Sequence, residues 1–316
     1  MIDQNRLRVL IGLLTGLATL ALLPGNPWAQ VAAPRHNPTA LESTLPFNPA
    51  ARAFQVGSRV GGTWQNMAAE IEDAGVTYTD FDGEGLAVNL SFVGEVFAFN
   101  FESFSSDTNN PAATPPANQH PNVFNTSQVE LALRWDIASF GVGQQTRTLG
   151  ENFGTLNVQK HSQLVYGISL QANKVWFLGF ATGTETETIG GGADAETRIR
   201  RMAGAYHSKN VHAEIYHEVA DEIKVGAGAE TRNGDGLNLE LLFGPFILGY
   251  ESYKVATENK SLLLPKGTES RQIITLGWIP KAGWAISLSQ RNVVDRDNPD
   301  EALTYTGNAF SVAYQY

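Results

Sequence analysis

Segments in which apolar and polar residues alternate recur along most of the chain, from about residue 75 to its end. In residues 128–137, QVELALRWDI, every second residue is apolar and most of the residues between are polar or charged. Successive side chains of a β-strand point to opposite faces, so this segment predicts a strand with one apolar face. No helical periodicity of comparable length separates such segments, which indicates an all-β fold. The same alternation occurs in residues 86–92, 97–101, 164–170, 176–180, 237–243, 274–278 and 284–288.

Strands of this kind build either a soluble β fold, with the apolar face inward, or a membrane barrel, with the apolar face toward lipid. The end of the chain favours the membrane barrel, because Phe310, Val312, Tyr314 and Tyr316 occupy alternate positions and the chain stops on an aromatic residue. This segment resembles the C-terminal strand of Gram-negative outer-membrane barrels. The resemblance implies an outer-membrane location and contact with the barrel-assembly machinery through this strand.

The connections between the predicted strands alternate between short and long. Short ones lie at residues 93–95, 172–174, 244–245 and 280–283, and long ones at residues 105–127, 184–196, 257–269 and 292–304. Membrane barrels have short periplasmic turns, longer external loops and aromatic residues at the membrane–water interface. The aromatic residues gather beside the short turns and belong to the following set: Phe92, Phe97, Trp176, Phe243, Phe246, Trp278, Trp284 and Tyr316.

Placing the end of the last strand in the periplasm sets the direction of every earlier strand. The result is a predicted transmembrane antiparallel up-and-down β-barrel over residues 75–316, with about 14 strands and 12 as the alternative. This count reads residues 211–231 as one long strand and includes two weak strands at residues 75–80 and 144–151.

Residues 1–29 have the three-part layout of a secretory signal peptide. Arg6 and Arg8 precede an uncharged apolar stretch, residues 9–23, and the small residue Ala29 offers a cleavage position. The stretch is shorter than the roughly 18–20 residues of a membrane-spanning helix, which argues against an uncleaved anchor. We expect export of the chain and cleavage after Ala29.

Residues 30–74 do not alternate and are rich in proline, with a short helix predicted at residues 67–74. This N-terminal segment is either a disordered periplasmic tail or a plug inside the barrel. Asn48, Pro49 and Ala50 are similar to the Asn-Pro-Ala element in the N-terminal hatch of the long-chain fatty-acid transporter family of outer-membrane barrels. That resemblance implies a fourteen-stranded barrel with these hatch-like residues ahead of its first strand.

If the apolar face of each strand meets lipid, the charged residues between the apolar ones line the lumen. They form either a polar pore wall that biases passage or a salt-bridged network that closes a narrow lumen. The same parity places His217 on the lipid-facing side. The predicted lumen-lining residues are Glu130, Arg134, Asp136, His212, Glu214, Glu218, Glu240, Glu251 and Arg291.

Composition mainly excludes classes of site. The chain has 316 residues, a formal net charge of −10 and no cysteine, which excludes disulfides, a thiol nucleophile and a cysteine-ligated metal. The acidic balance argues against nucleic-acid binding. Two acidic segments with glycine, residues 80–85 and 233–236, fit turns better than calcium loops. The sequence predicts no metal and no cofactor.

No histidine lies in a Ser or Asp context like that of barrel hydrolases, so no catalytic residue is predicted. The predicted function is an outer-membrane channel or transporter for small molecules, hydrophobic ones among them. One alternative is a closed barrel with a structural or surface-adhesion role, and the second is a barrel hydrolase. The expected partners are outer-membrane lipid and lipopolysaccharide, the barrel-assembly machinery and a small-molecule solute.

Overall fold

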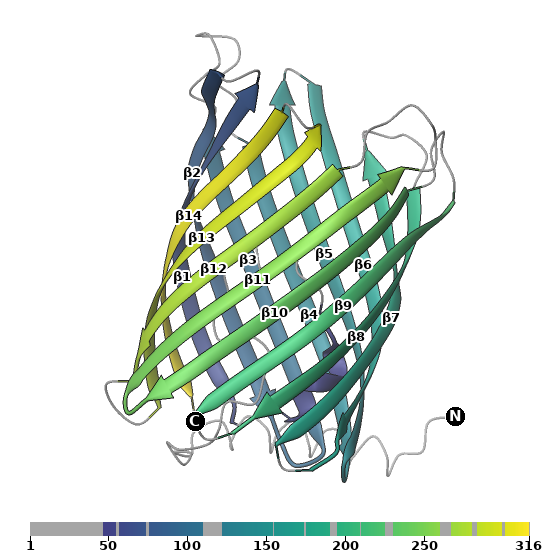
Figure 1. Ribbon diagram of the computed structural model, residues 1–316, viewed down its shortest axis with the longest axis vertical. Helices are drawn as coiled ribbons and strands as arrows, with labels where there is room; N and C mark the ends of the chain where they lie inside the picture. The colour runs from purple at the N-terminus through teal and green to yellow at the C-terminus, as the bar shows by residue number, and fades with distance from the viewer. Residues whose placement is uncertain are drawn as a thin grey trace, which may run out of the picture.

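Within the residues that the structure describes, fourteen β-strands form a closed barrel in the computed structural model (Figure 1). The described residues are 47–54, 57–73, 76–109, 122–153, 155–173, 175–189, 195–208, 210–224, 230–259, 267–279, 283–298 and 301–315. No helix among them is long and apolar enough to span a membrane. A 3-10 helix, η2, at Pro49–Phe54 precedes the strands β1 Arg59–Asp73, β2 Val76–Val93, β3 Phe97–Asn109, β4 Asn122–Trp135, β5 Ala138–Phe153, β6 Thr155–Gln171, β7 Trp176–Ile189, β8 Ala195–His207, β9 Val211–Lys224, β10 Glu230–Phe243, β11 Phe246–Asn259, β12 Gly267–Trp278, β13 Trp284–Asn298 and β14 Glu301–Gln315.

Each strand pairs antiparallel with its neighbours in the sequence, and β1 pairs with β14 to close the ring. The closing ladder runs from Arg59 opposite Gln315 to Asp73 opposite Glu301. Such closure pairs the two edge strands that an open sheet would leave exposed. The prediction of an all-β, up-and-down barrel with 14 strands is confirmed.

The barrel begins earlier than predicted. Its first strand starts at Arg59, so the predicted boundary at residue 75 is wrong, and the part of residues 67–74 that the structure describes is strand instead of helix. Gly61 and Gly62 break the apolar–polar alternation of β1, which hid the strand in the sequence.

Two other segment predictions are corrected without a change in the strand count. The segments 75–80 and 86–92, predicted as separate strands, belong to the single strand β2. The long strand predicted over residues 211–231 is wrong, because β9 ends at Lys224 and β10 begins at Glu230. Apolar residues keep the same parity through residues 225–229, so the pattern gave no sign of the break.

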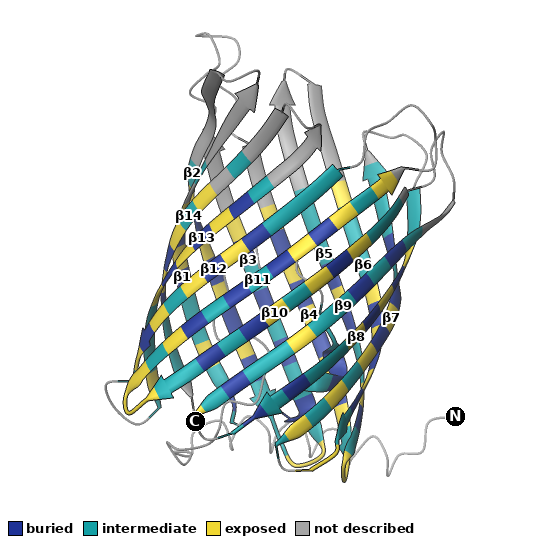
Figure 2. Cartoon of the chain, viewed as in Figure 1, coloured by how far each residue is buried: buried dark blue, intermediate teal, exposed yellow. Residues whose placement is uncertain are grey.

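Exposed and buried residues alternate along the strands (Figure 2). On β4 the apolar side chains of Val129, Leu131 and Leu133 are exposed, whereas Gln128 and Glu130 are buried. A soluble β fold would bury the apolar set, so the exposed apolar face is the lipid-facing exterior of a transmembrane barrel. The polar and charged face points to the interior.

Aromatic side chains lie on the exterior at the short-turn end of the strands. Trp135, beside the turn between β4 and β5, is 82% exposed. Ring centroids lie 5.0 Å apart for Trp176 and Tyr206 and 5.1 Å apart for Trp284 and Tyr314. Rings with an apolar body and a polar edge favour the membrane–water boundary, so these pairs mark one interface.

The acidic segments expected to be turns lie within strands instead. Residues 80–85 belong to β2, and residues 233–236 belong to β10. Gly234 lies beneath the ring of Tyr253, where a Cβ atom would come within 2.8 Å of the ring atom Cε2. A Cβ on Gly236 would likewise collide with the ring of Tyr216. The glycines therefore make room for inward-facing tyrosines.

Candidate functional site

Residues 47–54, here called the plug, lie inside the barrel near the short-turn end of the strands (Figure 1). The helix η2 within the plug packs against β4, β5 and β6, and less extensively against β3 and β7. Pro49 and Ala50 are buried. Ala53 packs in a small apolar cluster with Ala98 of β3 and Ala132 of β4. The plug thus occupies one side of the lumen.

Glycines on the inner wall leave the space that the plug fills. A Cβ on Gly141 would lie 2.6 Å from the Pro49 carbonyl carbon. A Cβ on Gly143 would lie 2.7 Å from the Phe47 ring. Gly167 and Gly179 face Asn48 in the same way, at 3.0 Å from Cγ and 2.8 Å from Nδ2. Real Cβ atoms do not approach so closely, so any side chain here would displace the plug.

Asn48 ties the plug to β6 through its side-chain amide. Its Nδ2 donates to the Ile168 carbonyl oxygen at 3.2 Å and to the Ser169 hydroxyl at 3.4 Å. Its Oδ1 accepts from the Ala50 backbone N–H at 3.1 Å. This hydrogen bond stabilises the turn at the start of η2. The Ala50 carbonyl in turn accepts from the Ser139 hydroxyl of β5 at 2.7 Å. The predicted hatch-like residues are therefore the ones that seat the plug on the wall.

An ion pair fixes the middle of the plug. The Arg52 Nε lies 2.6 Å from Glu130 Oε2, and the Glu130 side chain is only 1% exposed. The same carboxylate oxygen accepts from Asn100 Nδ2 at 2.8 Å, and Asn100 accepts from Asn89 Nδ2 at 3.1 Å. A buried charge needs such partners, so Glu130 is the wall's counter-ion for the plug.

Arg201 of β8 connects the start of the plug to a second cluster of charged residues. Its Nη1 donates to the Phe47 carbonyl at 3.1 Å, and its guanidinium carbon lies 5.3 Å from the centre of the Phe47 ring. On the other side, Arg201 Nε donates to Glu218 Oε2 and Nη2 donates to Gln163 Oε1 at 3.3 Å. Arg201 thus contacts both the plug and Glu218.

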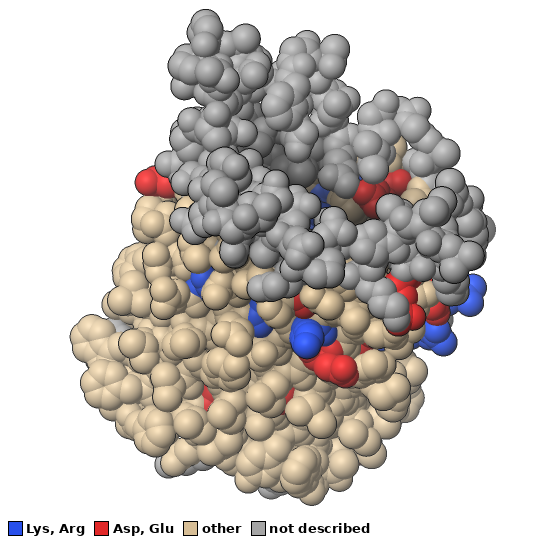
Figure 3. All heavy atoms as spheres, turned by 45° about the horizontal axis from the view of Figure 1, so that its top comes forward, with Lys and Arg blue, Asp and Glu red and all other residues tan. Residues whose placement is uncertain are grey.

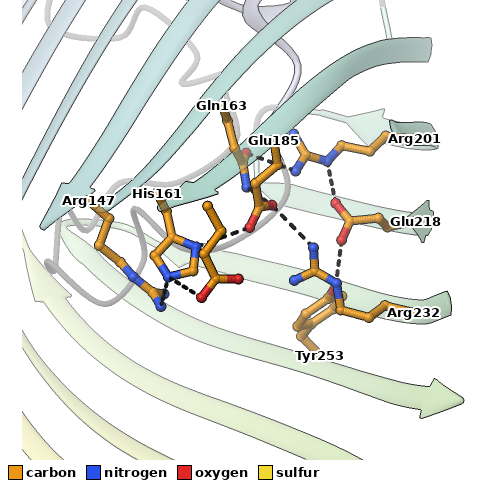
Figure 4. Close-up of polar contacts among 9 residues, drawn as sticks. Arg147, His161, Gln163, Glu185, Arg201, Glu218, Arg232 and Tyr253 are labelled. Carbon is orange, nitrogen blue, oxygen red and sulfur yellow. Dashed lines mark hydrogen bonds and ion pairs between the residues drawn. The ribbon is translucent and has the colours of Figure 1, made fainter. Parts of the chain in front are cut away.

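The second cluster, here called the inner network, spans several strands (Figure 4). The Tyr253 hydroxyl of β11 donates to Glu218 Oε1 at 3.3 Å. Glu185 of β7 accepts from Gln163 Nε2 at 2.7 Å and from Arg232 Nη2 at 3.2 Å. These contacts join β6, β7, β8, β9, β10 and β11 through paired charges along the inner face of the wall.

His161 belongs to the same network. Its Nδ1 lies 3.4 Å from Glu185, its Nε2 lies 3.6 Å from Glu187, and Arg147 of β5 approaches the same ring nitrogen at 3.4 Å. Glutamate and arginine side chains therefore surround the His161 ring.

Aromatic rings extend from the last residue of the plug to a pair of histidines. Phe54 lies beneath the Arg134 guanidinium and meets Phe177 edge to face, at centroid distances of 4.8 Å and 5.5 Å. Phe177 then contacts His207, and His207 stacks on His212 with centroids 3.8 Å apart. The end of the plug is therefore packed against β4 and β7, and the ring contacts continue along the wall to β8 and β9.

The structure places most of the predicted lumen-lining residues on the inner face. Asp136 is an exception, because it lies exposed in the turn after β4 with a φ of 53°. The apolar–polar alternation continues through this turn, so the even–odd pattern wrongly placed Asp136 in the lumen. His217 faces outward as predicted by parity, and its Nδ1 lies 2.8 Å from Asp235 on the outer face of β10. The inward-facing residues of the predicted set are Glu130, Arg134, His212, Glu214, Glu218, Glu240, Glu251 and Arg291.

Sequence reasoning missed two residues that hold the plug. Arg52 stood outside any recognised pattern, and Arg201 was absent from the predicted lining although it lies at an inward position of β8. The pair Gly141 and Gly143 offered a signal, since alternate glycines in a strand indicate close approach of another backbone. Among the described residues, no group of three or more His, Asp or Glu is arranged to hold a metal ion.

No family model matches the chain, and no curated protein matches it in sequence. Solved structures do match its fold. A TodX monoaromatic hydrocarbon channel mutant has a TM-score of 0.58 at 10% identity, with 93% of this chain and 100% of that chain covered. The CymD monoaromatic hydrocarbon channel has a TM-score of 0.56 at 10% identity, covering 89% and 94%. A Pseudomonas aeruginosa FadL homologue has a TM-score of 0.54 at 10% identity, covering 91% and 96%. At such low identity these likenesses establish the shared barrel fold.

Proposed function

We propose that this chain is an outer-membrane channel for small hydrophobic molecules, and that the plug controls passage through its lumen. The observation that carries the proposal is the plug seated on a glycine-lined inner wall of a lipid-facing barrel. The likeness in fold to two monoaromatic hydrocarbon channels supports the class of solute. The proposal assigns no catalytic reaction to the chain.

The plug is held in a way that permits release. Its polar contacts to the wall are few side-chain bonds, such as Asn48 to Ser169 and Arg52 to Glu130. A typical hydrogen bond contributes about 0.5–1.5 kcal/mol net and one to a charged group about 1.5–3 kcal/mol, so their sum is small beside that of the strand ladders. The barrel is closed by continuous backbone ladders on every strand. Displacing the plug therefore costs far less free energy than opening the wall.

The remaining parts of the proposal concern location and assembly. Residues 1–29 direct export and are removed, although they lie outside the described residues. The C-terminal strand is recognised by the barrel-assembly machinery, and the exterior contacts outer-membrane lipid and lipopolysaccharide. The apolar exterior with an aromatic interface supports this placement.

A reversible crosslink tests the channel and the plug together. The chain has no cysteine, so a pair introduced at Ala53 and Ala98, which pack against each other, has no other thiol to pair with. Gram-negative cells that express A53C/A98C are supplied with radiolabelled toluene under oxidising and then reducing conditions. We expect slow uptake when the plug is locked and uptake at the unmodified chain's rate after reduction.

The single variant A53C is the matched control, because it cannot form the crosslink and should respond to neither condition. Uptake by the unmodified chain equal to that of cells without it would contradict the channel. Equal uptake by the locked and reduced double variant would contradict the role of the plug.

The inner network favours a second candidate, a closed barrel with a structural role. The side-chain contacts of this network run from Gln163 of β6 to Tyr253 of β11, so it lines a wide arc of the inner wall with polar and charged groups. Planar-bilayer conductance of a variant lacking residues 47–54 separates the candidates. Conductance that stays at the level of the bare bilayer would favour the closed barrel. A surface-adhesion role stays a prediction about loops that lie mostly outside the described residues.

A further inference from the structure

The apolar exterior of the barrel ends at a definite position on each strand. On β10 the last outward apolar residue is Leu237 and the next outward residue is Asp235, and on β8 the change falls between Met202 and Arg200. We call the first outward polar residues beyond the apolar band the first ring. Its members are Asn66, Glu84, Ser103, Ser127, Gln144, Ser162, Thr182, Arg200, His217, Asp235, Ser252, Gln272, Gln290 and Asn308.

Charged side chains of the first ring have partners on the barrel itself. Arg200 forms an ion pair with Asp221, and His217 forms one with Asp235. Glu84 accepts from Trp64 Nε1 at 3.4 Å. Arg200 and Asp221 thus balance each other's charge at the edge of the apolar band, and Glu84 accepts from a neutral donor.

The next outward position on each strand, here called the second ring, is different. Lys160 of β6, Arg198 of β8 and Lys254 of β11 are exposed, and none of them has a hydrogen bond or ion pair with the described residues. The other second-ring residues whose side chains the structure describes are all uncharged: Ala68, Ser105, Asn125, Thr146, Thr184, Val219, Asn233, Ser270, Asn292 and Thr306.

The three cations therefore lie at one level and on one side of the barrel, over β6 to β11. Figure 3 shows the lower part of the visible surface nearly free of charge, with Lys and Arg side chains gathered above it beside Asp and Glu side chains. The level lies just past the apolar band, toward the end of the strands where residues 110–121 join β3 to β4. If the short turns face the periplasm, as the proposed function has it, this level coincides with the headgroups of the outer leaflet.

We propose that Lys160, Arg198 and Lys254 bind the phosphate groups of lipopolysaccharide in the outer leaflet. Arginine and lysine both bind phosphate groups. In the ladders, Arg198 lies opposite Asp221, which already pairs with Arg200. Lys254 lies opposite Asp235, which already contacts His217. Binding on one side only gives the barrel a lipopolysaccharide-contacting face, β6 to β11, and a face with uncharged amide and hydroxyl groups. The inference rests on the proposed outer-membrane orientation but not on the channel activity.

Native mass spectrometry of the full chain in detergent, titrated with diphosphoryl lipid A, tests this binding. The variant K160Q/R198Q/K254Q removes the three charges at exposed positions, and S105Q/N125Q/N292Q is the matched control on uncharged second-ring positions. Each cation near an anionic lipid surface contributes about 1 kcal/mol, so we expect the triple variant to bind lipid A about 100-fold more weakly. The control should bind like the unmodified chain.

Two further arms identify the ligand. Lipid A without its phosphates should bind the unmodified chain as weakly as diphosphoryl lipid A binds the triple variant. Inorganic phosphate at the same concentration should not compete, and full competition would assign the cations to a free anion and overturn the lipid assignment. Equal binding of diphosphoryl lipid A by the triple variant and the unmodified chain would also overturn it. Toluene uptake is measured separately, so a failed channel leaves this result interpretable.

Discussion

The inner wall has two sides that differ in the size and charge of their side chains. On β5, β6 and β7 the inward positions include Gly141, Gly143, Gly167 and Gly179, and the plug fills the space above them. On β9 to β13 the corresponding positions carry buried large polar residues, which are Glu218, Glu240, Glu251, Arg271 and Arg291. One side is shaped to receive a separate segment of the chain, and the other carries its own large polar side chains on the inner face. The difference shows that space, more than charge, decides where the plug sits.

The largest effect is expected from Gly141→Val, which removes that space. A Cβ there would lie 2.6 Å from the Pro49 carbonyl carbon and 2.8 Å from the Ala50 Cα, and backbone atoms cannot rotate away. Overpacking costs about 1–3 kcal/mol or more, which the plug can avoid by leaving its seat. We expect planar-bilayer conductance to rise to the level of the variant lacking residues 47–54. Gly62→Val, whose nearest atom would lie at 3.7 Å, is the control and should conduct like the unmodified chain.

A smaller effect is expected from Glu130→Gln, which keeps the space and removes the counter-ion of the plug. Arg52 would then hold an unpaired charge in a buried place, a change that costs about 3–5 kcal/mol in buried pairs. We expect faster hydrogen–deuterium exchange in residues 47–54. Glu240→Gln on the charged side should leave that exchange unchanged, and R52Q/E130Q should restore part of the protection. Unchanged exchange in E130Q would show that the glycine-lined seat alone holds the plug.

The smallest effect is expected from Tyr253→Phe on the charged side. It removes one hydrogen bond to Glu218, which still pairs with Arg201. The expected loss is about 1 kcal/mol of unfolding free energy, read from the urea midpoint. Exchange in the plug should not change. Tyr250→Phe on the lipid-facing side is the control, and a plug that loosens in Y253F would mean that the two sides are coupled more tightly than their contacts indicate.

Alternation carried most of the fold prediction, because a lipid-facing barrel repeats one pattern on strand after strand. Prediction from alternation failed where glycines or continuing apolar residues obscured a strand end, and where the alternation continued through a turn. Glycines obscured β1, the apolar residues of 225–229 hid the end of β9, and unbroken alternation through Trp135 and Ile137 placed Asp136 in the lumen. The strand count survived because one strand was gained and two predicted strands merged into β2.

The plug shows the other limit of sequence reasoning. Asn48, Pro49 and Ala50 stood out as a short motif, but their partners Ser139, Ser169 and Gly167 lie far along the chain. The local sequence of a strand does not show which inward glycine faces the plug and which, like Gly234, faces a tyrosine. The three cations of the second ring were likewise invisible until the edge of the apolar band had been located on every strand.

The ladder between β1 and β14 has a consequence for the order of assembly. The plug directly precedes β1, and β1 can pair with β14 only after all the intervening strands have been made. A contact between such distant segments forms late, because the entropy of closing the chain must be paid first. The ring thus closes only after the strands that seat the plug are already part of the wall. A plug that has not entered the lumen before closure can reach its seat only through an open end of the finished barrel. The time of closure therefore decides whether the newly folded barrel contains its plug.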